Sequence, residues 1–147
     1  MNKHLKVYLA GKMSDLSFED MNSWRFELKN LLHCFSEQKG YVLQVINPVD
    51  YFNFEEERQQ SDAEVEDYDL THVVSSDVII VNLDGLNTSI GTAIELHDAN
   101  YHNRIPVIAF GKKKDYDNLH PWIKRKITRI EETMDSVVEY ISDFYMI

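Results

Sequence analysis

The pattern of apolar and polar positions divides the chain into four short apolar runs, separated by segments in which apolar residues recur at helical spacing. The runs cover residues 6–10, 41–46, 78–83 and 107–110. Runs of this length that are rich in β-branched residues are typical of strands. The run at 78–83 is almost continuously apolar, as expected for a strand covered on both faces of a parallel sheet. We therefore predict four strands, of which those at 78–83 and 107–110 are buried.

The segments between these runs predict helices. From residue 18 the apolar positions form one stripe of helical period, which ends near Gly40, and Ser17 and Asp20 stand in capping-box spacing at its start. Residues 61–76 and 92–102 have helical composition, and Pro121 suits the first turn of a helix over 121–129. One apolar face over 134–145 predicts a helix that packs back on the domain. The stripe of the first helix consists of Met21, Trp24, Leu28, Leu31, Leu32 and Phe35.

Strands that alternate with helices at this spacing predict an α/β fold, a small Rossmann-like (flavodoxin-like) parallel sheet flanked by helices. The length of 147 residues suits one domain over residues 1–147. The segment 51–60 is polar and acidic with interspersed aromatic residues, and we expect a loop or a short helix there. Its aromatic side chains form either a lid over a site or a local cluster.

Charge narrows the range of partners. The chain holds 15 Lys and Arg against 25 Asp and Glu, so its formal net charge is -10. Such a surface repels a phosphate backbone and an anionic membrane leaflet, so we expect neither a nucleic acid polymer nor a membrane as partner. A small phosphorylated ligand is still compatible with this charge, because one local pocket can oppose the overall sign.

The cysteine content and the start of the sequence indicate a reducing compartment. Cys34 is the only cysteine and lies in an apolar run, so we expect a buried structural thiol and no intramolecular disulfide. The first residues lead directly into a strand pattern without the apolar core of a signal peptide, and no apolar run reaches membrane-spanning length. These features predict a cytoplasmic protein.

Several common catalytic motifs are missing. There is no phosphate-binding G-x-x-x-x-G-K-[ST] loop, no G-x-G-x-x-G after the first strand and no G-x-S-x-G nucleophile elbow. The six histidines are scattered without a recognisable ligand spacing, so we predict no metal site and no cofactor. Carboxylates remain as the candidates for chemistry.

The segment after the third apolar run carries the candidate site. Ligands of open α/β sheets bind beyond the carboxyl ends of the strands, so this loop and the following helix should face a crevice. Glu95 falls in the first turn of the predicted helix, where the helix dipole would hold its carboxylate ionised. It is either a positioned nucleophile or a residue that merely complements the dipole on a solvated face. Asp69 provides a second carboxylate, and paired carboxylates cleave glycosidic bonds.

With these residues, the sequence resembles the nucleoside 2-deoxyribosyltransferase superfamily over most of its length. The resemblance rests on the order and spacing of several short segments rather than on any one of them. They are K-V-Y-L-A-G at 6–11, Asp69-Leu70 eight residues before the Asp77 of S-D-V-I-I-V, G-T-A-I-E at 91–95, I-P-V-I at 105–108, and Asn118-Leu119-x-x-Trp122.

The resemblance implies a role for each matched residue. Glu95 would attack the anomeric carbon and form a covalent glycosyl-enzyme, and Tyr8, otherwise a core tyrosine, would orient Glu95 through a hydrogen bond. Asp69 would assist protonation of the departing base, which is a poor leaving group unless protonated. Asn118 would reach the site of a neighbouring subunit in a homo-oligomer and hold the 5' end of the sugar. The implied activity is transfer of deoxyribose from a 2'-deoxynucleoside to another nucleobase.

One departure from the family pattern leaves an alternative open. Many transferases of this family carry an acidic residue six positions before the nucleophile, and this chain has Ser89 there. The related 2'-deoxynucleoside 5'-monophosphate N-glycosidases have a serine that binds phosphate at this position. Ser89 is thus either a phosphate ligand or the N-cap of a helix, and Asp84 lies near enough in sequence to replace the missing acid. We also expect substrate contacts at Gly11 and Gly91.

A third interpretation comes from a different functional class. In this interpretation the chain keeps the fold without the reaction and acts as a non-catalytic module that binds nucleotides. The presence of Glu95, Asp69 and Tyr8 together favours the enzyme, because a binding module has no use for a nucleophile.

Overall fold

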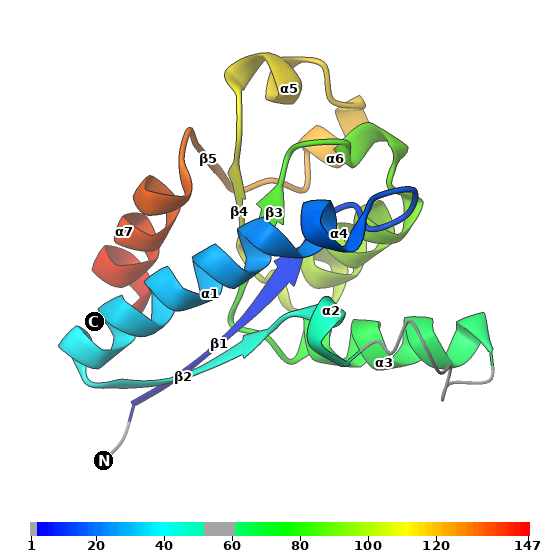
Figure 1. The fold of residues 1–147 in the computed structure, drawn as a ribbon. Helices are drawn as coiled ribbons and strands as arrows, with labels where there is room; N and C mark the ends of the chain where they lie inside the picture. Colours follow the sequence, from blue (N-terminus) through cyan, green and yellow to red (C-terminus); the bar gives the residue numbers. More distant parts are fainter. Residues whose placement is uncertain (1–2, 52–60) are drawn as a thin grey trace.

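A five-stranded parallel sheet lies at the centre of the computed structural model, which describes residues 3–51 and 61–147 (Figure 1). All neighbouring strands pair in parallel, and the strand order is β2-β1-β3-β4-β5. This is the flavodoxin-like order, so the predicted α/β fold is confirmed. The strands are β1 (Lys3–Ala10), β2 (Tyr41–Ile46), β3 (Val78–Asn82), β4 (Val107–Phe110) and β5 (Arg129–Glu131).

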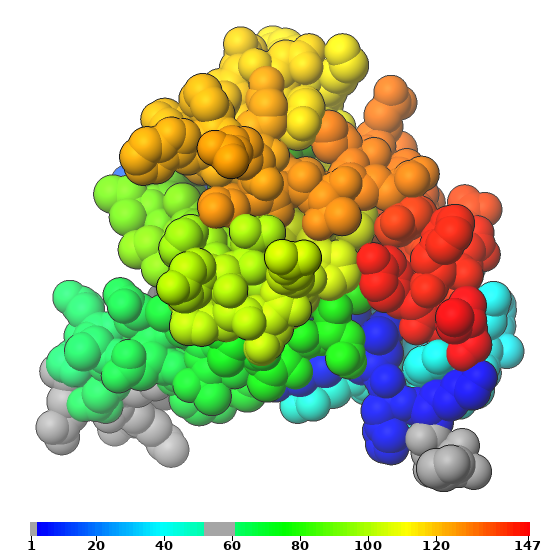
Figure 2. Space-filling model, turned by 180° about the vertical axis from the view of Figure 1, so that it is seen from behind, coloured from blue at the N-terminus to red at the C-terminus, as the bar shows by residue number. Residues whose placement is uncertain are grey.

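Helices cover both faces of the sheet. Helices α1 (Phe18–Lys39) and α7 (Met134–Tyr145) pack on one face, where they meet Val7 and Leu9 of β1. Helices α3 (Asp62–Val74) and α4 (Ile90–Asn103) pack on the other face, where Tyr8 and Ala10 point. Figure 2 shows α3 and α4 in green shades, side by side, below the orange residues that follow α6. The short helices are α2 (Pro48–Tyr51), the 3₁₀ helix η1 (Leu86–Thr88), α5 (Lys113–Asp117) and α6 (Pro121–Lys124).

Helix α1 forms as its sequence predicts. The Ser17 hydroxyl accepts a hydrogen bond from the Asp20 backbone N–H at 3.1 Å, and Gly40 ends the helix in the left-handed region at φ 71°. The apolar stripe faces the sheet, and the Trp24 ring lies 5.5 Å from the Phe110 ring, centroid to centroid. The stripe also includes Arg25, which is fully buried and which the hydrophobic pattern alone does not predict.

The end of the chain differs from the prediction. The helix expected over 121–129 ends at Lys124, and Arg129–Glu131 form the edge strand β5 instead. This strand pairs only with β4 and is partly exposed, so it lacks the apolar run that marks a buried strand. Helix α7 confirms its prediction, with Thr133 and Ser136 forming a capping box at its start.

Three further expectations concern the cysteine, the segment 51–60 and membrane-spanning helices. Cys34 is exposed, so the prediction of a buried thiol is wrong. In α1 the buried positions nearby are Leu32 and Ser36, and Cys34, midway between them, lies on the other side of the helix. The predicted loop or short helix over 51–60 lies outside the described residues except for Tyr51, which ends α2. Within residues 3–51 and 61–147, no helix has the length and apolar character needed to cross a membrane.

Candidate active site

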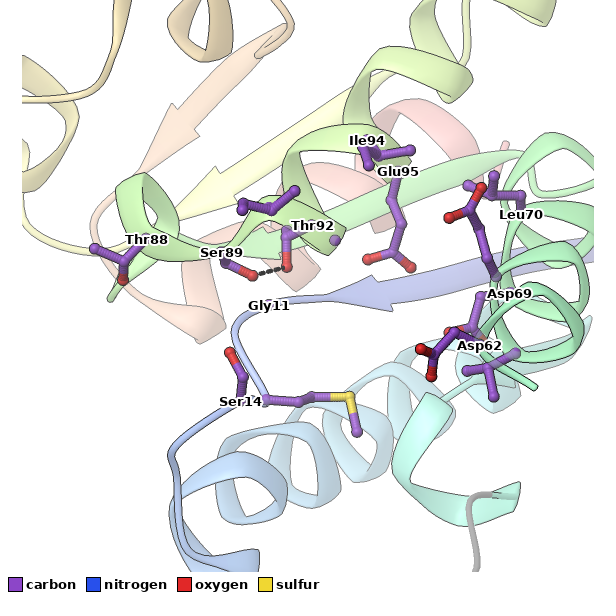
Figure 3. Close-up of a pocket in the computed structure, with 15 residues that line it drawn as sticks. Gly11, Ser14, Asp62, Asp69, Leu70, Thr88, Ser89, Thr92, Ile94 and Glu95 are labelled. Carbon is purple, nitrogen blue, oxygen red and sulfur yellow. Dashed lines mark hydrogen bonds between the residues drawn. The ribbon is translucent and has the colours of Figure 1, made fainter. Parts of the chain in front are cut away.

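A pocket of about 420 Å³ opens at the carboxyl ends of β1 and β3 (Figure 3). These two strands are neighbours at the point where the strand order reverses, which is where ligands bind in folds of this type. The loop after β1 provides one wall, the start of α4 a second wall and helix α3 a third. The lining residues include Gly11, Met13, Ser14, Asp62, Glu66, Asp69, Thr88, Ser89, Gly91 and Glu95.

Glu95 extends from α4 into this pocket toward the end of β1 (Figure 3). Helix α4 begins at Ile90, two residues earlier than predicted, so Glu95 lies in the second turn and not in the first. Burial raises the pKa of Glu95 to about 7, although the hydrogen bond from Tyr8 and the charge of Arg25 lower it. The sequence predicts an ionised carboxylate in a first helical turn, whereas the structure has Glu95 in the second turn with its pKa raised by burial.

Tyr8 lies beneath the pocket in the middle of the sheet. Its side chain is fully buried, and its hydroxyl donates a hydrogen bond to Glu95 Oε2. Burial and the neighbouring Glu95 carboxylate raise the pKa of Tyr8 far above its ordinary value, so the phenol keeps its proton. The hydrogen bond that the sequence suggested between these two residues is present.

Asp69 lies on α3, on the wall beside Glu95 (Figure 3). It accepts a hydrogen bond from the hydroxyl of Tyr51, the last residue of α2. Burial raises the pKa of Asp69, while the Tyr51 hydrogen bond and the charges of His72 and Arg25 lower it. The structure thus brings two carboxylates with raised pKa values to one pocket, an arrangement common at sites of acid and base chemistry.

Arg25 is a component of this site that was not predicted from the sequence. Its guanidinium donates to the backbone carbonyls of Gly11, at 2.9 Å, and of Met21, while its Nε has no hydrogen-bond partner. Burial lowers the pKa of Arg25 to about 10, which leaves it charged at neutral pH. The sequence did contain a clue to its burial. Arg25 lies four residues after Met21 and three before Leu28, and this spacing places it on the buried face of α1.

Hydroxyl groups gather at the other end of the pocket. Ser89 occupies the N-cap position of α4, but its hydroxyl bonds to Thr92 Oγ1 at 2.6 Å instead of capping the helix backbone. The Lys12 ammonium donates to Thr88 Oγ1 at 2.9 Å, which links the loop after β1 to the loop after β3. Gly91 lies in the first turn of α4, and no atom approaches within 4 Å of where its Cβ would be.

Besides Tyr8, which lies beneath the pocket, two predicted site residues do not line it. Asp84 is exposed just after β3, and its backbone N–H donates to Asn82 Oδ1 at 3.0 Å. The segment after β3 first lines the pocket at Thr88, the last residue of η1, so Asp84 does not take the place of the acid that the family pattern has at the position of Ser89. Asn118 is exposed at the end of α5, and its carbonyl accepts from Asn87 Nδ2 at 2.8 Å. Over the described ranges, no three His, Cys, Asp or Glu side chains group as a metal site requires.

Comparison with known proteins identifies the fold. No protein-family model matches the chain, and no curated protein matches it by sequence. It is similar to the crystal structure of a conserved protein from Enterococcus faecalis V583, with a TM-score of 0.70 and 18% identity over 95% of this chain and 98% of that one. It is also similar to a 2-deoxyribosyltransferase from the psychrotolerant bacterium Bacillus psychrosaccharolyticus, with a TM-score of 0.51 and 21% identity over 92% and 91% of the two chains. The chain therefore has the nucleoside 2-deoxyribosyltransferase-like fold.

Proposed function

We propose that this protein is an N-glycosyl-transfer enzyme that cleaves the N-glycosidic bond of 2'-deoxynucleosides and passes the deoxyribose to another nucleobase. The observation that carries the proposal is the Tyr8 hydrogen bond to Glu95 inside a pocket that Asp69 also lines. The solved 2-deoxyribosyltransferase with the same fold supports this choice of reaction.

The reaction follows from the two carboxylates. Ionised Glu95 attacks the anomeric carbon and forms a glycosyl ester, while the bond to the base breaks and the base takes a proton from Asp69. The incoming base then displaces Glu95 from the same carbon and returns a proton to Asp69. Two displacements at one carbon retain its configuration. Tyr8 holds Glu95 in place through both steps and stays protonated.

A product analysis with matched variants tests this proposal. The purified protein is incubated with deoxynucleosides, with and without a free acceptor base, and the products are separated by chromatography. We expect base exchange in the wild type and no turnover in Glu95→Gln, which is nearly isosteric and cannot form the ester. Glu139→Gln on the exposed face of α7 serves as the control and should keep full activity. Undiminished turnover in Glu95→Gln would refute the assignment of the nucleophile.

A second candidate is the 2'-deoxynucleoside 5'-monophosphate N-glycosidase, in which water accepts the sugar. The observation that favours it is the polar end of the pocket, where Ser89 and Thr88 present hydroxyl groups and Lys12 contributes a cation beside them. In this case only monophosphates release free base, and Ser89→Ala raises KM for them about tenfold through loss of a hydrogen bond to a charged group. Saturable binding without any product would instead indicate the non-catalytic module.

We also propose that Asn118 serves the site of a second copy of this chain. It lies outside its own pocket and accepts a hydrogen bond from Asn87, which lines a surface groove with Ile90 and Trp122, 79% and 75% exposed. Exposed apolar side chains of this size are typical of protein interfaces. Light scattering after size exclusion should show an oligomer, and Asn118→Ala should lower turnover without changing the mass. A monomer with full activity would contradict this proposal.

A further inference from the structure

Asn87 joins the loop after β3 to the turn between α5 and α6, and it has none of the roles proposed above. Its Nδ2 donates a hydrogen bond to the Asn118 carbonyl at 2.8 Å, and its Oδ1 accepts one from the His120 backbone N–H, also at 2.8 Å. A backbone carbonyl only accepts and a backbone N–H only donates, so both partners require the same orientation of the Asn87 amide. One side chain thereby fixes the backbone on both sides of Leu119.

The turn that Asn87 holds has few other anchors. In the described part of the chain, Asn87 makes the only hydrogen bonds that reach residues 118–120 from outside the stretch between the start of α5 and the end of α6. Of these three residues only Leu119 is buried, and its side chain belongs to the same core cluster as that of Leu86, the residue before Asn87. The core therefore holds the middle of the turn, and Asn87 sets the direction of the backbone on either side.

The side chain of Asn118, in contrast to its backbone, has no partner within the described residues. It is exposed and lies outside the pocket of its own chain. A polar side chain on a fixed backbone suits the binding of a ligand from outside, because less freedom is lost on binding and no internal hydrogen bond has to break. We propose that Asn87 is a positioning residue that holds Asn118 in place for the site of the second copy. This inference rests on the proposed function, and within it on the role of Asn118.

Asn87 also borders the pocket of its own chain. It directly precedes Thr88, which lies at the end of the pocket away from Asp69 (Figure 3). The Lys12 ammonium holds Thr88 from the other side, with 2.9 Å between Nζ and Oγ1. The competing explanation for any effect of Asn87 is therefore an action on its own pocket through Thr88, and the two explanations differ in what they predict for mixed oligomers.

Turnover of deoxynucleosides by single and double variants tests whether Asn87 acts through Asn118. Asn87→Leu is close in shape and removes both hydrogen bonds, so kcat should fall about tenfold as Asn118 loses its fixed position. Asn87→Leu combined with Asn118→Ala should be no slower than Asn118→Ala alone, because residues that act through one another are not additive. Asn100→Leu, the same exchange at an exposed position of α4, serves as the control and should keep full activity.

Mixed oligomers separate action on the second copy from action on the own pocket. Asn87→Leu subunits are co-expressed with a large excess of Glu95→Gln subunits, so that almost every intact Glu95 has a neighbour with intact Asn87 and Asn118. We expect turnover per intact Glu95 to return to about the wild-type value. Turnover that stays about tenfold low in these oligomers would show an action on the own pocket and would overturn the inference, as would strict additivity of Asn87→Leu with Asn118→Ala.

Amide hydrogen exchange of the substrate-free protein tests the positioning without any turnover. The His120 N–H should be protected in the wild type and exchange at least about tenfold faster in Asn87→Leu, because its acceptor is lost. Asn87→Asp keeps this acceptor and should keep the protection, although it loses the donor to the Asn118 carbonyl. An unprotected His120 N–H in the wild type would overturn the inference. A wild type that turns over no nucleoside refutes the proposed function, while exchange still decides whether Asn87 holds the turn.

Discussion

Replacing Gly11 with alanine would place a methyl group inside the space of the Trp24 ring. The new Cβ would lie 2.7 Å from Cζ2 and 3.3 Å from Cη2 of Trp24, and 3.4 Å from Nη2 of Arg25. Carbon atoms in protein cores keep about 3.5–4.0 Å apart, so the ring must move by up to about 1 Å. Trp24 is held between Phe110 and the Arg25 guanidinium, which leaves it little freedom. Overpacking of this kind costs about 1–3 kcal/mol.

Gly91 offers a matched control, because it lines the same pocket and no atom lies within 4 Å of the position that an added methyl group would take. Gly91→Ala should be as stable as the wild type, or up to about 1 kcal/mol more stable, since alanine favours the helix. Urea unfolding followed by circular dichroism measures both variants. Trp24→Leu should make Gly11→Ala less costly by removing the ring. Equal stability of Gly11→Ala and wild type, or strict additivity with Trp24→Leu, would refute the reasoning.

Two further predictions concern charge in the pocket. Burial raises the pKa of Glu95 in the folded protein to about 7, from 4.5 in the unfolded chain. Between these pH values the folded protein holds a proton that the unfolded chain has lost, so the free energy of unfolding falls as pH rises. The loss is on the order of 3 kcal/mol above pH 7. Glu95→Gln should therefore unfold at higher urea concentration than the wild type at pH 8 and lack this pH dependence; equal midpoints at pH 8 would contradict it. Arg25→Met should move the acid limb of kcat/KM to higher pH by on the order of one pH unit, because a cation that lowers the pKa of Glu95 is lost. Arg25→Lys keeps the charge and should show a smaller shift, and an unmoved limb in Arg25→Met would count against this role.

The buried strands and the long helices were predictable from the sequence because each carries its own signal. Strand β4 is an apolar run and is buried along its whole length, and helix α7 has one apolar face, which is buried against the domain. Strand β5 has no such signal, since Arg129 and Glu131 are compatible with a loop and only pairing with β4 makes them a strand. Cys34 was misplaced because an apolar neighbourhood in sequence does not specify which side of a helix is buried.

Only those residues of the candidate site that belong to short sequence motifs could be predicted. Glu95, Asp69 and Tyr8 were found from local spacing and resemblance, and the structure brings them together. The pKa of Glu95 is raised because other elements of the fold bury its side chain, so this shift could not be predicted from the sequence of α4 alone. Tyr51 was part of a segment whose role stayed open, because its hydrogen bond to Asp69 depends on how α2 packs against α3.

The central position of β1 has a consequence for how the protein folds. Val7 pairs with Val45 on one side and with Val78 on the other, and both partners lie far along the chain. A parallel sheet of this kind contains no local hairpin that could start it, so every strand pair closes a long loop. Such topologies fold slowly, and their unpaired apolar strands are exposed to aggregation in the meantime. During synthesis β1 has to wait for β3 before both of its edges are paired, which makes chain elongation part of the folding pathway.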